Sequence, residues 1–113
     1  MMNQDLFLSY LRHYESKNLE QMAEMFSQDV TLRDWKIYVQ GKEAAVAETK
    51  ANFEAAKSIQ IEVLSLYEAS NTVAGELNIL VDGNIELFVV DVVDFDPNGK
   101  IKAIRAFLGR GDD

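Results

Sequence analysis

The fold of this chain can be read outward from one segment, Ile85-Glu86-Leu87-Phe88-Val89-Val90-Asp91-Val92-Val93-Asp94-Phe95. Its apolar and β-branched residues predict a β-strand, in which side chains alternate between two faces. One face carries Ile85, Leu87, Val89, Asp91, Val93 and Phe95. Asp91 is the only polar member of that face. Burying an ionised carboxylate costs several kcal/mol unless it is paired, and the alternative is that it keeps its proton.

The segments around this strand predict an antiparallel meander. Ile59–Glu68 and Thr72–Val81 alternate in polarity, and Asp82-Gly83 supplies a tight hairpin turn before the Asp91 strand. Asp96-Pro97-Asn98-Gly99 forms a second turn, because proline presets φ and glycine tolerates positive φ. The last strand is predicted over Lys100–Leu108. Beyond it we expect Gly109–Asp113 to fray.

The first half of the chain is predicted to be mainly helical. An apolar stripe at helical spacing is formed by Leu6, Phe7, Tyr10, Leu11 and Tyr14. A second helix is predicted from its cap at Asn18 to about Gln28, and a third from Gly41 to about Lys57. A short strand, Val30–Trp35, lies between them. The order of elements predicts an α+β fold with helices on one face of a curved sheet.

Composition limits the classes of function. The 113 residues fit a single domain, 1–113, and the 48% hydrophobic content allows a real core. The net charge of −8 disfavours binding to nucleic acid or to anionic membrane surfaces. The absence of cysteine excludes disulfides and thiolate metal sites, and no apolar run is long enough to span a membrane. With no secretory signal at the start, we expect a cytoplasmic protein.

The second face of the Asp91 strand is also apolar in its middle, with Phe88, Val90 and Val92. Helices are expected to cover only one side of the sheet, so these apolar side chains on the second face would be exposed to solvent unless another subunit packs on them. We predict a homodimer through the outer sheet face.

Three polar residues could converge on one site, namely Tyr10, Asp34 and Asp91. A phenol and a neutral carboxylic acid can donate hydrogen bonds to a developing oxyanion. A second carboxylate can act as a general base. Each residue also has a structural interpretation: Tyr10 as core, Asp34 as a loop cap, and Asp91 as a partner of Arg105 if the hairpin register allows it. No cofactor is predicted, and the single histidine, His13, has no cluster that would bind a metal.

The chain resembles the nuclear transport factor 2-like superfamily, which includes ketosteroid isomerases and SnoaL-type polyketide cyclases. The resemblance rests on Met25-Phe26-Ser27-Gln28-Asp29-Val30-Thr31, on Gly41-Lys42-Glu43 and on the closing segment Val93–Ile101. It implies a cystatin-like cone, in which a curved, mostly antiparallel sheet wraps around the N-terminal helices and opens at one end to an apolar pocket. Many members are dimers through the sheet.

The resemblance to ketosteroid isomerases extends to the three polar residues. It implies that Tyr10 is the oxyanion-hole tyrosine, Asp34 the general base, and Asp91 the protonated aspartate. The chain departs from that pattern in four places. Trp35 follows the base, and the loop from there to Gly41 is short and carries Lys36 and Tyr38. Thr49 replaces a supporting tyrosine, and Leu108 stands near the end of the last strand. These departures make a steroid an unsafe choice of substrate.

We expect the pocket to be lined by Tyr14, Phe26, Trp35, Phe53, Val89, Ile104 and Leu108. The expected function is binding of a small apolar molecule, with possible proton transfer next to a carbonyl by an isomerase or a cyclase-like lyase. The alternatives are a binding domain without catalysis, and an interaction module whose cone is filled by Trp35 and Phe53. The sequence alone does not name the ligand.

Overall fold

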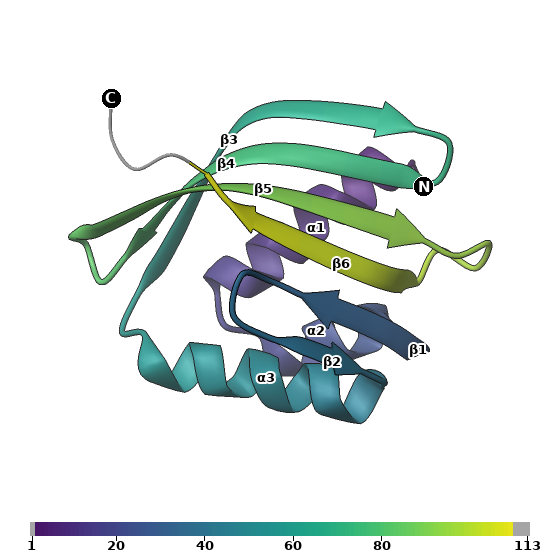
Figure 1. The fold of residues 1–113 in the computed structure, drawn as a ribbon, viewed down its shortest axis with the longest axis horizontal. Helices are drawn as coiled ribbons and strands as arrows, with labels where there is room; N and C mark the ends of the chain where they lie inside the picture. The colour runs from purple at the N-terminus through teal and green to yellow at the C-terminus, as the bar shows by residue number, and fades with distance from the viewer. Residues whose placement is uncertain (1, 110–113) are drawn as a thin grey trace.

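The computed structural model describes residues 2–109, so that of the tail expected to fray only Gly109 is included (Figure 1). The helices are α1 (Asn3–Glu15), α2 (Leu19–Met25) and α3 (Lys42–Ala55). The strands are β1 (Phe26–Arg33), β2 (Tyr38–Gln40), β3 (Ile59–Ala69), β4 (Thr72–Val81), β5 (Ile85–Phe95) and β6 (Ile101–Leu108). None of these helices is long and apolar enough to cross a membrane.

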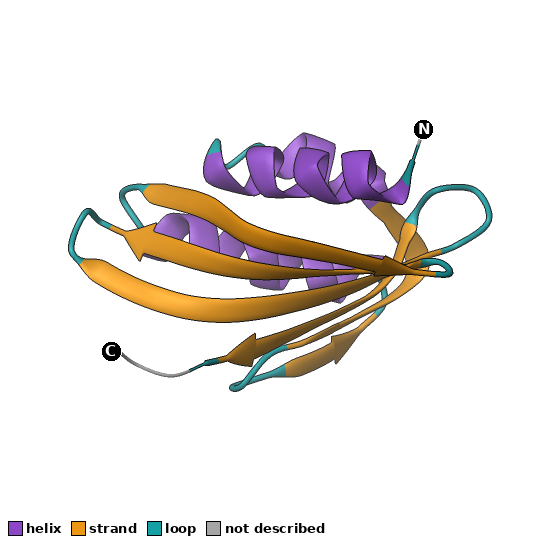
Figure 2. Cartoon of the chain, turned by 90° about the horizontal axis from the view of Figure 1, so that it is seen from above, coloured by secondary structure: helices purple, strands orange, loops and turns teal. Residues whose placement is uncertain are grey.

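The strands form one six-stranded sheet in the order β2-β1-β6-β5-β4-β3. All neighbouring pairs are antiparallel except β1 and β6, which run parallel. The sheet is strongly curved and unclosed, and the helices gather on one side of it (Figure 2). The α+β class and the curved, mostly antiparallel sheet predicted from the sequence are therefore confirmed.

The core lies between the helices and the inner face of the sheet. The predicted face of β5 is the inner one, since Val89, Asp91, Val93 and Phe95 are buried while Val90 is exposed. The helices contribute Phe7, Leu11 and Met22, which are almost completely buried. Each fully buried side chain of this kind contributes about 1.5–3 kcal/mol relative to an exposed one.

Two boundaries and one short strand differ from the prediction. The second helix ends at Met25 and not near Gln28, because Phe26 pairs with Ile101 of β6 and its side chain is buried. Strand β1 ends at Arg33, so that Asp34 and Trp35 belong to the following loop. The short strand β2 was not predicted, because three residues carry too little pattern and its order comes from pairing with β1.

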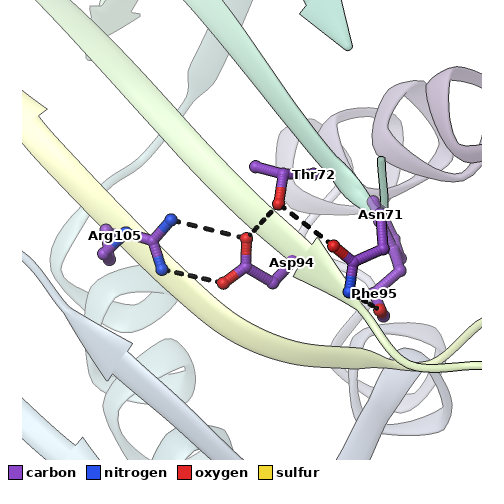
Figure 3. A network of polar contacts seen from close by, with 5 residues as sticks. All are labelled: Asn71, Thr72, Asp94, Phe95 and Arg105. Atoms are coloured by element: carbon purple, nitrogen blue, oxygen red, sulfur yellow. Dashed lines mark hydrogen bonds and ion pairs between the residues drawn. The ribbon is translucent and has the colours of Figure 1, made fainter. Parts of the chain in front are cut away.

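The β5–β6 register settles the position of Arg105. Ala106 lies opposite Asp91, which places Arg105 on the other face of the sheet. There its guanidinium forms an ion pair with Asp94, with 2.9 Å between Nη1 and Oδ2 (Figure 3). Pairing of Asp91 with Arg105, left open by the sequence, is therefore wrong, because one step along a strand reverses the face.

A small polar network surrounds Asp94 on the outer face (Figure 3). The Thr72 hydroxyl donates a hydrogen bond to Asp94 Oδ1 at 2.6 Å. Next to it, the Asn71 amide donates to the carbonyl oxygen of Phe95 at 3.0 Å and ties the β3–β4 turn to the end of β5.

Candidate functional site

A cavity of about 460 Å³ lies between the helices and the inner face of the sheet. Its volume falls in the range of small-molecule pockets. Its walls are mostly apolar and come from α1, α3, strand β1 and the loop after it, and strands β3 to β6. Tyr10, Asp34 and Asp91 all line this one cavity.

Asp91 is held in an environment that offers it no polar partner. Its cross-strand neighbours are Gly75 on β4 and Ala106 on β6, and neither has a polar side chain. The residue is 7% exposed, and burial raises the pKa of its carboxyl group to about 7. Within residues 2–109, no side-chain oxygen or nitrogen is sealed from solvent without a partner. The Asp91 carboxyl group, which makes no hydrogen bond there, therefore reaches the cavity.

Gly75 is required by the packing beside Asp91. A Cβ atom at this position would lie 2.6 Å from the ring of Phe7, which is completely buried. The missing side chain lets α1 approach the sheet at the point where Asp91 stands. We did not predict this role, and the signal available in the sequence was a lone glycine inside an alternating strand.

Tyr10 projects from the buried stripe of α1 into the cavity. Its pKa is raised well above the usual value, mainly by burial and further by the negative charge of Asp91. A phenol in this environment keeps its proton, and no acceptor for that proton is found in the described part of the chain. Tyr10 is therefore available as a hydrogen-bond donor to whatever occupies the cavity.

Asp34 both caps a loop and lines the cavity, which are the two roles considered from the sequence. Its Oδ1 accepts hydrogen bonds from the backbone N–H groups of Lys36 and Ile37, at 2.7 and 2.9 Å, and so it caps the loop after β1. It also lines the cavity. The two backbone donors fix the orientation of the carboxylate, and Oδ2 makes no hydrogen bond to the described residues.

Tyr14 and Asn52 form a second polar pair in the cavity wall. The Asn52 amide donates a hydrogen bond to the Tyr14 hydroxyl, with 3.2 Å between Nδ2 and Oη. Burial raises the pKa of Tyr14 to about 12. Thr49, one turn earlier on α3, also lines the cavity, but its hydroxyl donates to the carbonyl oxygen of Ala45 at 2.8 Å. We did not predict Asn52; its spacing of three residues from Thr49 was the available signal.

Five of the seven residues expected to line the pocket do so: Tyr14, Phe26, Trp35, Val89 and Ile104. Phe53 lies behind the wall, where its ring packs edge-on against Tyr14 at a centroid distance of 5.0 Å. Leu108, at the end of β6, is 47% exposed and does not line the cavity. Among residues 2–109, no three histidine, aspartate or glutamate side chains gather as a metal site.

Comparisons with known proteins agree with this architecture. A family model for the SnoaL-like domain matches residues 7–104. A search of curated proteins found no match to the sequence. Among solved structures, similarity extends to SalBIII, an epoxide hydrolase/cyclase-like enzyme with a role in pyran ring formation in the polyether salinomycin. SalBIII is 24% identical with a TM-score of 0.83, and the match covers 95% of this chain and 90% of that one.

Two further solved structures share the fold at lower identity. A candidate SnoaL-like polyketide cyclase from Shewanella denitrificans is 15% identical with a TM-score of 0.85, covering 95% of this chain and 90% of that one. A candidate ketosteroid isomerase from Kribbella flavida is also 15% identical, with a TM-score of 0.84 and coverage of 98% and 80%. The chain has the fold of nuclear transport factor 2-like proteins, and it belongs to the SnoaL-like domain family.

Proposed function

We propose that this protein binds a small, mostly apolar carbonyl compound and catalyses proton transfer at the carbon next to the carbonyl. The observation that carries the proposal is the presence of Tyr10, Asp34 and Asp91 in the wall of one cavity. Tyr10 and Asp91 are suited to donate hydrogen bonds, and Asp34 is an oriented carboxylate.

In the proposed reaction, Asp34 Oδ2 removes a proton from the α-carbon, and the electron pair of the broken C–H bond moves toward the carbonyl oxygen. Tyr10 and the neutral form of Asp91 donate hydrogen bonds to the enolate oxygen that results. If the substrate has a β,γ double bond, this enolate is a dienolate, and Asp34 returns the same proton to its γ-carbon while the double bond moves next to the carbonyl. This completes an isomerisation without any co-reactant. If the substrate has a second carbonyl, the enolate carbon attacks it instead, and Asp34 gives its proton to the resulting alkoxide, which is a cyclase-like aldol step.

Known relatives support this class of chemistry without deciding the substrate. The similar structures include a candidate ketosteroid isomerase and a candidate polyketide cyclase. Trp35 and Lys36 line the cavity in the loop after Asp34, at the place where the sequence departs from the ketosteroid isomerase pattern. A ligand other than a steroid is therefore expected.

The proposal is tested by incubating the protein with a 3-oxo-Δ5 steroid and with smaller enolisable ketones in D₂O. Proton NMR then measures exchange at the α-carbon, and ultraviolet absorbance measures double-bond migration. Asp34→Asn is expected to lower the rate at least about 100-fold, the usual contribution of a general base. Asp5→Asn, an exposed charge-matched control on α1, should retain the full rate. No exchange above buffer with any ketone, or equal rates in wild type and Asp34→Asn, would reject the proposal.

Binding without catalysis is the second candidate, because Asp34 Oδ1 is already engaged by its own loop. In that case an apolar ketone should bind equally well to wild type and to Asp34→Asn, as measured by calorimetry. No α-carbon exchange should accompany this binding. An interaction module without any ligand would bind none of the ketones.

We also propose that two copies associate through the outer sheet face. Val90 and Phe107 are cross-strand neighbours there and both are exposed, Phe107 by 53%. Tyr67 adds a further exposed ring on the same face. Sedimentation is expected to give a dimer for wild type and a monomer for Phe107→Glu. A wild-type monomer at high protein concentration would contradict the proposed dimer.

A further inference from the structure

We propose that Tyr14 is a second phenol that donates a hydrogen bond to the bound ligand, and that Asn52 is the residue that positions it. This inference rests on the proposed function and deepens it by naming a ligand class. A cavity with two separate donor positions suits a ligand with a second oxygen acceptor near its carbonyl, such as a β-dicarbonyl compound.

The ring of Tyr14 is held between two other aromatic rings. Tyr10 lies one helical turn before it on α1, with ring centroids 6.2 Å apart in an edge arrangement. Phe53 of α3 packs on it in a second edge arrangement at 5.0 Å. Contacts of this kind favour defined ring orientations, so Tyr14 presents its hydroxyl group to the cavity from a restricted position.

The hydrogen bond from Asn52 determines what the Tyr14 hydroxyl can do. A phenol has one proton to donate and can accept hydrogen bonds at its oxygen. Asn52 Nδ2 occupies the oxygen as a donor. The Tyr14 proton has no acceptor among residues 2–109. Tyr14 is also a cavity-lining side chain. The proton is therefore left for a ligand oxygen.

The two phenols occupy different electrostatic positions. Tyr10 interacts with Asp91, whereas Tyr14 interacts with both Asp91 and Asp34 and also with Glu48. Both phenols line the same cavity as Asp34 and Asp91, and their ring centroids are 6.2 Å apart. A ligand whose reacting carbonyl is bound by Tyr10 and Asp91 can therefore place a neighbouring oxygen at Tyr14.

The decisive experiment compares two ligands with the same carbon skeleton, 1-phenyl-1,3-butanedione and 1-phenyl-1-butanone, by calorimetry. Tyr14→Phe is expected to weaken binding of the dione about fivefold to tenfold, the loss of roughly one hydrogen bond, and to change binding of the monoketone less than twofold. Asn52→Asp should do the same, because its carboxylate would accept the phenol proton. Gln21→Glu, an exposed charge-matched control on α2, should change neither.

A ligand-free measurement tests the positioning role of Asn52 separately. In protein labelled with ¹³C at tyrosine Cζ, Asn52→Leu should move the Tyr14 resonance at neutral pH, while Gln21→Glu leaves it in place. Asn52 is exposed, so these substitutions are not expected to disturb folding. An unchanged Tyr14 resonance in Asn52→Leu would overturn the positioning role.

The outcomes separate the two proposals. If both ketones bind and Tyr14→Phe weakens both equally, the second-donor role is wrong and the proposed function stands. If neither ketone binds to wild type, the inferred ligand class and the second-donor role are wrong, while the proposed function is decided by the α-carbon exchange experiment. Selective loss of dione binding in both Tyr14→Phe and Asn52→Asp is the result that supports the inference.

Discussion

Strand β5 carries two aspartates on opposite faces of the sheet, and they behave in opposite ways. Asp91 on the inner face lies opposite Gly75 and Ala106, has no polar partner in the described chain, and has its pKa raised to about 7 by burial. Asp94 on the outer face bonds to Arg105 and Thr72, and these partners lower its pKa. The same side chain in the same strand is thus placed in two different chemical states.

The difference shows that the neighbouring strands, and not β5 itself, decide what an aspartate does here. On the outer face, an arginine and a threonine supply charge-assisted hydrogen bonds. On the inner face, Gly75 and Ala106 supply no polar group, and Asp91 lines the cavity. The outer face uses its acid for structure, whereas the inner face keeps an acid that destabilises the fold when it is ionised.

The largest expected effect is on the pH dependence of stability in Asp91→Asn. Below about pH 4 the carboxyl group is protonated in both folded and unfolded chains and contributes nothing. Between about pH 4 and pH 7 the unfolded chain releases this proton while the folded chain keeps it, so the stability of wild type falls as pH rises. Above pH 7 the cost is complete, at up to about 4 kcal/mol. Asp91→Asn should therefore gain stability relative to wild type as pH rises.

Urea unfolding from pH 4 to pH 8 measures this difference. Asp94→Asn is the control in the same strand. It should lower the free energy of unfolding, because the pKa of Asp94 is lowered in the folded chain. Parallel stability profiles for wild type and Asp91→Asn would show that the carboxyl group is not buried as described.

Gly75→Ala should have the next largest effect. The added Cβ atom would lie 2.6 Å from the Phe7 ring, in a packed region where neither group can move freely. A destabilisation of about 1–3 kcal/mol is expected from overpacking. The double variant Gly75→Ala/Phe7→Leu should lose less stability than the sum of its two single variants. Strict additivity in thermal or urea unfolding would disprove the contact.

Arg105→Met tests the outer pair and should cost less, about 0.5–1 kcal/mol, because the Arg105 side chain is 41% exposed and the pair is screened by solvent. The contribution of Asp94 is present above about pH 4 and is lost as pH falls through its lowered folded pKa. The cost of Arg105→Met should therefore shrink at high salt and at low pH. A cost independent of both would indicate lost packing and not lost charge.

The smallest effect is expected for Thr72→Val, which removes the hydroxyl donor to Asp94 and preserves the shape of the side chain. A loss of about 0.5 kcal/mol at neutral pH is expected, since Asp94 keeps its bond to Arg105. Thr31→Val, on the same outer face of β1, is the matched control. If both variants lose the same stability, the Thr72–Asp94 bond contributes nothing.

Sequence patterns predicted most of the elements because hydrophobic periodicity is a local property. The stripe of α1 and the alternation of β5 place Phe7, Tyr10 and Val93 in the core as expected. The ends of elements were less predictable, because Phe26 joins β1 only through pairing with Ile101, a residue distant in sequence.

The candidate site was predicted only in part. Tyr10, Asp34 and Asp91 line one cavity, and their roles in catalysis remain a proposal. Asn52 was missed because its contact with Tyr14 crosses from α3 to α1, and spacing along α3 alone does not reveal that contact.

The amino-acid sequence by itself determined which face of α1 and of β5 is buried, because burial follows from spacing along a single element. Only the tertiary structure decided that Arg105 pairs with Asp94 and leaves Asp91 alone, because register depends on contacts between separate strands. The cavity is likewise a tertiary property. It exists because α1, α3, the loop after β1 and the inner face of the sheet enclose a volume that no single segment encodes.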